Sequence, residues 1–221
     1  MSYDSLLLDH DGVVVTLGDE TALADAAHRS LRDAGVDAPP DDAVETLSVS
    51  VTPDELRALS DRYGLDPDRL WGHRDARVEE TLRAETTAGR KRPYDDVDIL
   101  RELSVPTGIV SNNQTRIVEF VLDHYDLRHH FETIHARSPT PESLTRKKPR
   151  PNFLEAAMAD LSVSNPLYVG DSETDVLAGH RAGVDVAFLR RAHNADRSLS
   201  VEPTFEVSTL DEVAALVDGR A

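Results

Sequence analysis

The chain has 221 residues and is strongly acidic: 41 Asp and Glu against 24 Lys and Arg give a net charge of −17. This charge argues against binding to nucleic acid or to an anionic membrane. Only three of the basic residues are Lys, and an acidic surface of this kind is typical of salt-adapted proteins, because molar salt shortens the Debye length to about 3 Å. We therefore expect a halophilic protein from a haloarchaeal source.

The composition excludes several other classes. There is no Cys, so disulfides and thiolate metal sites are excluded. No apolar run approaches the ~18 residues of a membrane span, and the first residues lack the basic region and apolar core of a signal peptide. The 39% share of hydrophobic residues argues against disorder. We expect a folded cytoplasmic protein with one core domain that carries an insertion.

A short apolar run, Leu6 to Leu8, predicts a buried strand that stops at Asp9-His10-Asp11-Gly12. In open parallel sheets, ligands bind beyond the carboxyl ends of the strands, which is where Asp9 falls. Two acids at this spacing suit a carboxylate nucleophile, an acid/base partner or oxygen ligands for Mg2+. Gly12 allows a sharp turn and the close approach of a ligand. Taken alone, these residues also fit a solvated turn, because Asp and Gly are common in turns.

Residues 16–91 predict helices with no strand between them. We expect Trp71 and Tyr63 to lie in the core of this helical bundle. The polar segment 86–91 is the predicted return hinge. The helix signals are a helix over 19–34 that stops at Gly35, a capping box at 52–55 that begins a helix ended by Gly64, and Asp66-Pro67 at the start of a third helix.

From residue 94 onward, short strands alternate with helices, which is the pattern of a parallel sheet. The fold class is therefore α/β: a Rossmann-like parallel sheet core domain (residues 1–15 and 92–221) with an inserted α-helical bundle cap (residues 16–91). The expected strands are 107–110, 133–134, 167–169 and 186–189, the expected helices are 97–103, 117–124, 153–161, 176–183 and 208–217, and the expected long loop is 136–151.

Polar residues follow three of the predicted strands, and a parallel sheet brings them to one rim. Four carboxylates without a cation would repel one another, so we expect Mg2+ to bind there. The metal and Lys148 could then hold a phosphoryl group, with its oxygens bound by Ser111 and by backbone N–H groups near Gly12 and Asn112. The residues concerned are Asp9 and Asp11 after the first strand, Ser111 and Asn112 after the second, and Asp171 and Asp175 after a later one.

These motifs resemble those of the haloacid dehalogenase superfamily, in its phosphatase branch with a helical cap. The resemblance spans essentially the whole chain and keeps the family order. The motifs are D-H-D-G-V at 9–13, S-N-N at 111–113, K-P-R-P at 148–151 and G-D-S-E-T-D at 170–175.

The resemblance implies a catalytic role for four residues. Asp9 would be the nucleophile that forms an aspartyl-phosphate. Asp11 would protonate the leaving alcohol and then activate water. Ser111 would bind the phosphoryl oxygens, and Lys148 would neutralise charge on the nucleophile and the phosphate.

The resemblance also implies a metal site. Asp9, Asp171 and the main-chain oxygen of Asp11 would bind Mg2+, and Asp175 would be an indirect or water-mediated ligand. We expect the side chain of His10 to point away from the site because of strand alternation.

The function implied by the resemblance is a Mg2+-dependent phosphomonoester hydrolase, monomer or homodimer, whose partner is a small phosphate ester such as phosphoglycolate or a sugar phosphate. Dehalogenases of the superfamily lack the second acid, so Asp11 favours phosphate esters. A phosphosugar mutase keeps the same motifs and stays open. A non-enzymatic phospho-acceptor receiver module also carries Asp, then Ser or Thr, then Lys, but Asp11 and the helical insertion argue against it.

Three other features have a plain structural interpretation. The segment 47–52 lies where caps of this family lower a specificity loop, although it equally fits an ordinary turn between helices. The basic run 146–151 fits a solvated face as well as a functional loop. The nine His residues, including His129 and His130, show no spacing typical of metal ligands.

Overall fold

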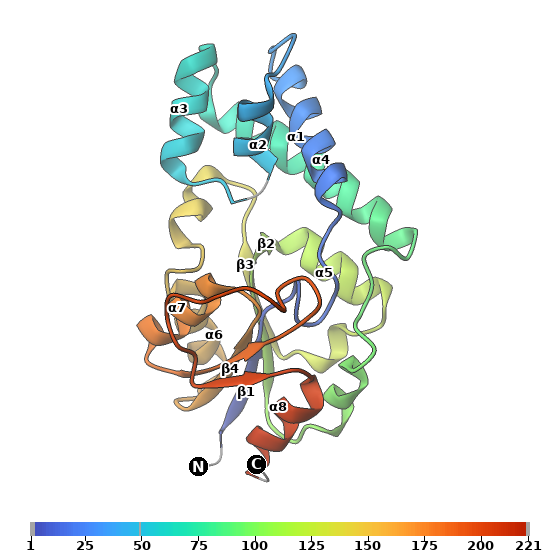
Figure 1. Ribbon diagram of the computed structural model, residues 1–221, viewed down its shortest axis with the longest axis vertical. Helices are drawn as coiled ribbons and strands as arrows, with labels where there is room; N and C mark the ends of the chain where they lie inside the picture. Colours follow the sequence, from blue (N-terminus) through green and yellow to red (C-terminus); the bar gives the residue numbers. More distant parts are fainter. Residues whose placement is uncertain (1–2, 49, 220–221) are drawn as a thin grey trace.

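The structure is a computed structural model that describes residues 3–48 and 50–219 (Figure 1). Position 49, within the segment expected to form a specificity loop, lies outside the described residues. The strands form one sheet in the order β3-β2-β1-β4-β5-β6, and every pairing between them is parallel. The strands are β1 (Ser5–Leu8), β2 (Thr107–Gln114), β3 (Thr133–Arg137), β4 (Pro166–Gly170), β5 (Asp185–Leu189) and β6 (Phe205–Val207).

Strand alternation divides the apolar residues of the sheet between two layers. Leu6 and Leu8 belong to one buried cluster, which includes residues of α5 (Thr115–His124) and α8 (Leu210–Val217). Leu7 points to the opposite face and belongs to a second cluster. That cluster contains residues of α6 (Asn152–Leu161) and α7 (Glu173–Ala182). Helices on both faces confirm the expected α/β architecture, and they explain why Leu6 to Leu8 reads as a continuous apolar run.

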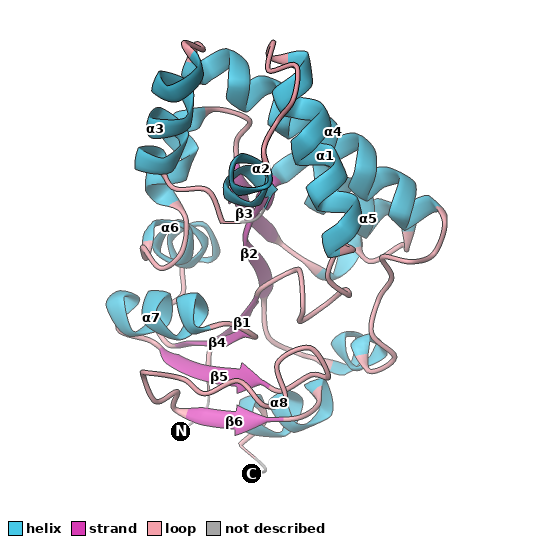
Figure 2. Ribbon diagram, turned by 45° about the horizontal axis from the view of Figure 1, so that its top comes forward, coloured by secondary structure: helices cyan, strands magenta, loops and turns pink. Residues whose placement is uncertain are grey.

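Four α-helices of the described segment between β1 and β2 pack together at one end of the molecule (Figures 1 and 2). Leu31, Leu47 and Trp71 are buried in a cluster of their own between these helices. Thr52 forms the expected capping box with Glu55, and Gly64 ends the same helix with φ +63°. The helices are α1 (Glu20–Asp33), α2 (Asp41–Ser48), α3 (Pro53–Tyr63) and α4 (Pro67–Thr87).

Two elements were not expected from the sequence. Helix α2 follows Pro39-Pro40, begins with Asp41 and Asp42, and buries Ala43 and Leu47 one turn apart. These are ordinary helix-start signals in a segment of only eight residues. Strand β6 has three residues at the edge of the sheet, which is too short for a periodic pattern.

Several predicted boundaries differ from the structure. Strand β2 continues to Gln114, so Ser111 and Asn112 lie within the strand and not after it. Helix α4 continues to Thr87, so its end overlaps the predicted return hinge at 86–91. Residues Val97–Glu102 form a 3-10 helix, as is common for short connecting segments. The expected loop 136–151 contains the end of β3 and a 3-10 helix, Pro141–Arg146. No helix in the described ranges is both long and apolar enough to span a membrane.

Candidate functional site

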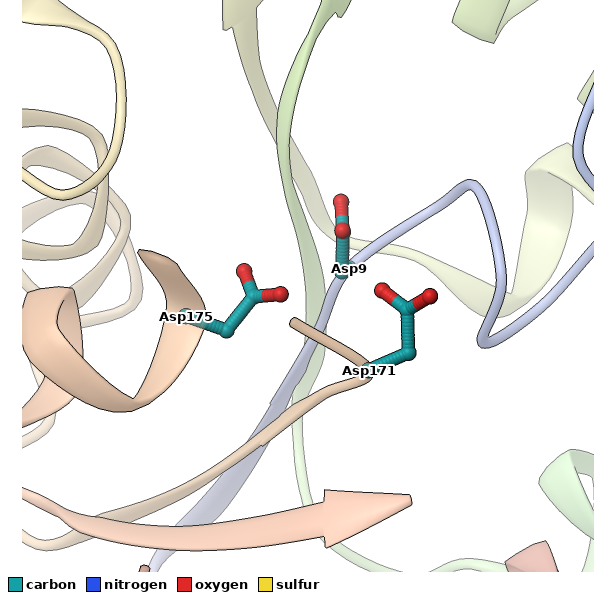
Figure 3. A group of neighbouring side chains, drawn as sticks. All are labelled: Asp9, Asp171 and Asp175. Atoms are coloured by element: carbon teal, nitrogen blue, oxygen red, sulfur yellow. The ribbon is translucent and has the colours of Figure 1, made fainter. Parts of the chain in front are cut away.

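Three acidic residues meet at the carboxyl ends of β1 and β4. The N–H of Asp9 donates to the carbonyl of Val169 (2.9 Å), which ties Asp9 to the neighbouring strand. Asp171 follows β4 directly, and Asp175 lies in the first turn of α7. All three are buried, and one carboxylate oxygen from each lies within 4.8 Å of the others. Figure 3 shows the three carboxyl groups facing one another, so the predicted convergence of these acids is observed.

Lys148 lies between two of these acids. Its Nζ is 2.9 Å from Asp9 Oδ1 and 2.7 Å from Asp175 Oδ1, and it also donates to the carbonyl of Val110 (3.1 Å). Burial opposes the charge on Lys148, but the two carboxylates outweigh burial and raise the pKa of the ammonium group. Lys148 therefore stays protonated and holds Asp9 in a fixed position.

Tyr168 contacts this group of charged residues, and sequence analysis missed it. Its hydroxyl donates to Asp175 Oδ1 (2.7 Å) and accepts from Lys148 Nζ (3.0 Å). Asp175 also accepts from the N–H (3.1 Å) and the hydroxyl (2.5 Å) of Ser172. Although burial acts in the other direction, Lys148 and the hydroxyl groups of Ser172 and Tyr168 lower the pKa of Asp175. Tyr168 lies in the middle of an apolar strand, and the apolar pattern of that strand predicts only a core residue. No sequence signal separates it from Leu167 or Val169.

Asp11 lies apart from the three acids. Its Oδ1 accepts from Lys91 Nζ, and its Oδ2 accepts from Asn113 Nδ2 (2.9 Å). His10 is fully buried, with Nδ1 3.4 Å from Asp11 Oδ2, so it contacts Asp11 although we expected it to point away. Burial alone would raise the pKa of Asp11, but Lys91 and His10 lower it well below its usual range.

Lys91 and Asn113 were both missed as site residues. Lys91 falls in the predicted hinge and was interpreted as a polar connector, yet it is fully buried and also donates to the carbonyl of Thr16 (2.8 Å). A usable signal was present, because the chain has only three Lys residues and one of them lies at this junction. Asn113 stands beside two residues that were singled out.

Ser111 and Asn112 occupy the last part of β2. Ser111 is buried, and its Oγ accepts from the N–H of Asn113 (3.1 Å). The Asn112 side chain accepts from the N–H of Lys148 (2.8 Å) and donates to its carbonyl (3.0 Å). Asn112 thus anchors the backbone that carries Lys148, a role different from the backbone donor predicted for it.

Two glycines allow the close packing at this rim. Gly12 has φ +83°, and a Cβ there would lie 2.1 Å from Asp171 Oδ2. A Cβ at Gly170 would lie 2.2 Å from the Cβ of Asp175. Each glycine therefore leaves room for one of the acids.

His193 and Asn194 were also missed. His193 Nε2 lies 2.6 Å from Asp171 Oδ2, and Asn194 Nδ2 donates to the Asp171 carbonyl (2.8 Å). They follow β5, another strand of the parallel sheet, so the rule that found the other acids would have found them too. Despite His193, burial raises the pKa of Asp171.

The three acids fit a divalent cation. Asp9, Asp171 and Asp175 offer only oxygen donors, which hard cations such as Mg2+ prefer. With all three acids ionised and Lys148 protonated, the group would carry two negative charges; burial opposes this charge and raises the pKa of Asp9 well above its usual value. A buried group with this charge is stabilised by a doubly charged ion. The side chain of Asp11 lies outside the group, and its main-chain oxygen as a ligand stays a prediction.

A cavity of about 260 Å³ opens beside this rim. Asp11, Asn112 and Asn113 line it from the sheet side, and Val78 and Leu82 line it from α4. Two buried arginines, Arg74 and Arg137, also reach it.

Comparisons with known proteins agree with this geometry. A family model for haloacid dehalogenase-like hydrolases matches residues 7–189. A phosphoglycolate phosphatase from Pseudomonas fluorescens is 32% identical over 122 residues, which cover 54% of this chain and 43% of that protein. A phosphoglycolate phosphatase from Photobacterium profundum is 27% identical over 166 residues, which cover 74% of this chain and 63% of that protein.

Among solved structures, CbbY from Rhodobacter sphaeroides in complex with phosphate aligns with a TM-score of 0.71 at 16% identity and covers 96% of each chain. This likeness concerns the fold. The relatives named here are bacterial, so they give no support to the expected haloarchaeal source. The chain spans about half the length of the Pseudomonas protein, whereas the family model covers most of the chain. The chain therefore belongs to the family of haloacid dehalogenase-like hydrolases.

Proposed function

We propose that this chain is a phosphatase that hydrolyses a small phosphate ester through a phosphoryl group carried on Asp9. The observation that carries the proposal is the position of Asp9, a buried carboxylate at the end of β1 with Lys148 Nζ 2.9 Å away and two more acids beside it. Ser111 and Asn112 of β2 and Gly12 after β1 are the other residues that we propose for this site.

In the first step, a carboxylate oxygen of Asp9 attacks phosphorus, and the bond from phosphorus to the alcohol oxygen breaks. Asp11 gives its proton to the departing alkoxide. Because Lys91 and His10 favour ionised Asp11, this step requires that substrate binding weakens the contact with Lys91.

In the second step, Asp11 takes a proton from water, the water oxygen attacks phosphorus, and the bond between Asp9 and phosphorus breaks to release phosphate. Lys148 offsets the negative charge on Asp9 and on the phosphoryl oxygens in both steps. When bound by Asp9, Asp171 and Asp175, Mg2+ would neutralise further charge on the phosphoryl group.

We propose that the helices within residues 16–91 act as a cap that shapes the cavity above Asp11. The names of the relatives make phosphoglycolate the first ester to test. Small sugar phosphates come next.

The test is release of phosphate from 2-phosphoglycolate and p-nitrophenyl phosphate with Mg2+, using the parental protein, Asp9→Asn and the control Asp95→Asn. Asp95 is exposed and pairs only with Arg92 among the ion pairs found, so its variant should keep the parental rate. Asp9→Asn should fall to background, and excess chelator should abolish parental turnover. Full turnover by Asp9→Asn would refute the proposal.

A further inference from the structure

Two arginines line the cavity, which Asp11 and the exposed Glu20 also line. Arg74 comes from α4 and Arg137 from the end of β3, so one belongs to the inserted helices and the other to the sheet. Only 8% of Arg74 and 2% of Arg137 is exposed. Buried guanidinium groups are costly to desolvate, and a negative charge beside them offsets that cost.

Asp75 is a carboxylate that contacts both of these cations. Asp75 forms a bidentate pair with Arg137 (2.7 and 2.8 Å) and lies 3.3 Å from Arg74 Nη1. Two other nitrogens of Arg74 donate to backbone carbonyls. Nε donates to Leu47 and Nη2 donates to Ser48 (3.3 Å each). These three side chains together keep one positive charge.

A third basic residue, Lys147, lies near these arginines. Its ammonium donates to the carbonyl of Val51 (2.8 Å), and burial together with repulsion from Arg74 and Arg137 lowers its pKa to about 8. Glu55 acts in the opposite direction but does not outweigh the two arginines.

The two guanidinium groups are also held in place before any ligand binds. Both lie over the ring of Trp71, at 5.0 Å for Arg74 and 4.7 Å for Arg137. Trp71 itself is buried. Pre-organised donors lose little entropy on binding an anion, and the planar guanidinium suits carboxylate and phosphate oxygens.

We propose that Arg74 and Arg137 form a second anion-binding subsite, which holds a negatively charged group on the leaving alcohol of the ester. The shared chemistry is that of a carboxylate or a second phosphate. The cavity places this subsite beside Asp11, which the proposed function makes the proton donor to that alcohol. The inference rests on the proposed function and extends it to the class of substrate.

The test compares three esters: 2-phosphoglycolate, ethane-1,2-diol bisphosphate and the control ethyl phosphate, which has no anionic group besides the phosphoryl group. The variants are Arg74→Gln and the matched control Arg77→Gln. Arg77 lies on the same helix but pairs with Asp33 and Glu80, away from the cavity lining. Because charge-assisted hydrogen bonds are lost, we expect Arg74→Gln to lower kcat/KM for the two esters with a second anionic group about 10- to 100-fold, mainly through KM.

Ethyl phosphate should change less than threefold in Arg74→Gln, and Arg77→Gln should behave like the parental protein. The preferred ester with a second anionic group identifies the anion as carboxylate or phosphate. Equal losses on all three esters would overturn the proposal and make the two arginines a structural contact between α4 and β3. Arg74→Lys, which keeps the charge, should restore part of the preference if Arg74→Gln is unstable.

Calorimetric binding to Asp9→Asn separates this inference from the proposed function. If 2-phosphoglycolate binds at least tenfold more tightly than ethyl phosphate, the subsite stands even where hydrolysis fails. Equal affinities would overturn it.

Discussion

The acidic rim, here called the phosphoryl end, and the arginine-lined cavity beside it, the leaving-group end, carry opposite charge patterns. At the phosphoryl end, one ammonium group contacts two of three buried carboxylates. At the leaving-group end, two buried guanidinium groups share one carboxylate. We propose that the first pattern binds a cation and that the second binds an anion. The difference separates the group common to all phosphate esters from the part that distinguishes them. The residues are Asp9, Asp171, Asp175 and Lys148 at the phosphoryl end, and Arg74, Arg137 and Asp75 at the leaving-group end.

Adjacent lysines allow the two ends to be tested separately. Lys148→Met leaves Asp9 and Asp175 without their common cation, so we expect loss of measurable turnover and a destabilisation of about 3–5 kcal/mol. Lys147→Met removes a charge near the arginines, so it should keep turnover of ethyl phosphate. Turnover and urea unfolding of both variants check this. Similar turnover and similar stability of the two variants would contradict the proposed difference between the phosphoryl end and the leaving-group end.

The two ends also differ in how far the sequence predicts them. The acids of the phosphoryl end follow strands of a parallel sheet, so a local pattern and one topological rule bring them together. Arg137 ends a strand of the same sheet, so that rule applies to it too, but Arg74 lies in a helix with no local signal. Tertiary packing of α4 against β3 places the two in one cavity. Lys91 is an intermediate case. The scarcity of Lys in the sequence singles it out, but its position in the predicted hinge gave no indication that it is buried.

A pH series sharpens the account of the leaving-group end. The pKa of Lys147 is about 8, so this group is mainly charged at pH 7 and mainly neutral at pH 9. Arg74 keeps its charge over this range, since its pKa is about 10, and both esters stay ionised. We expect the preference for 2-phosphoglycolate over ethyl phosphate to fall about threefold, or ~0.6 kcal/mol.

Using the ratio of kcat/KM for two esters cancels the pH dependence of the chemical step. Lys147→Met should give a flat ratio between pH 7 and pH 9. A ratio that stays flat in the parental protein would show that the charge on Lys147 does not contribute to this preference.

Salt should separate the acidic exterior from the buried interior. Added KCl shortens the Debye length from about 10 Å at 0.1 M to about 3 Å at 1 M, which weakens repulsion between surface carboxylates. With a net charge of −17, the thermal unfolding midpoint should rise with KCl into the molar range, while the preference for esters with a second anionic group changes less, because Arg74 and Arg137 are buried. A midpoint that stays level or falls would contradict the salt-adapted interpretation.

The most direct test of the account uses the two acids of the first motif, because it assigns chemically identical groups different tasks. Protein is mixed with a 32P-labelled phosphate ester that has a good leaving group, quenched in acid and examined for protein-bound label. Asp11→Asn keeps the nucleophile but slows attack by water, so label should accumulate on it; loss of a proton donor typically slows the rate by about 100- to 10,000-fold. Asp9→Asn should carry no label. Label on Asp9→Asn, or parental turnover by Asp11→Asn, would contradict the assigned roles.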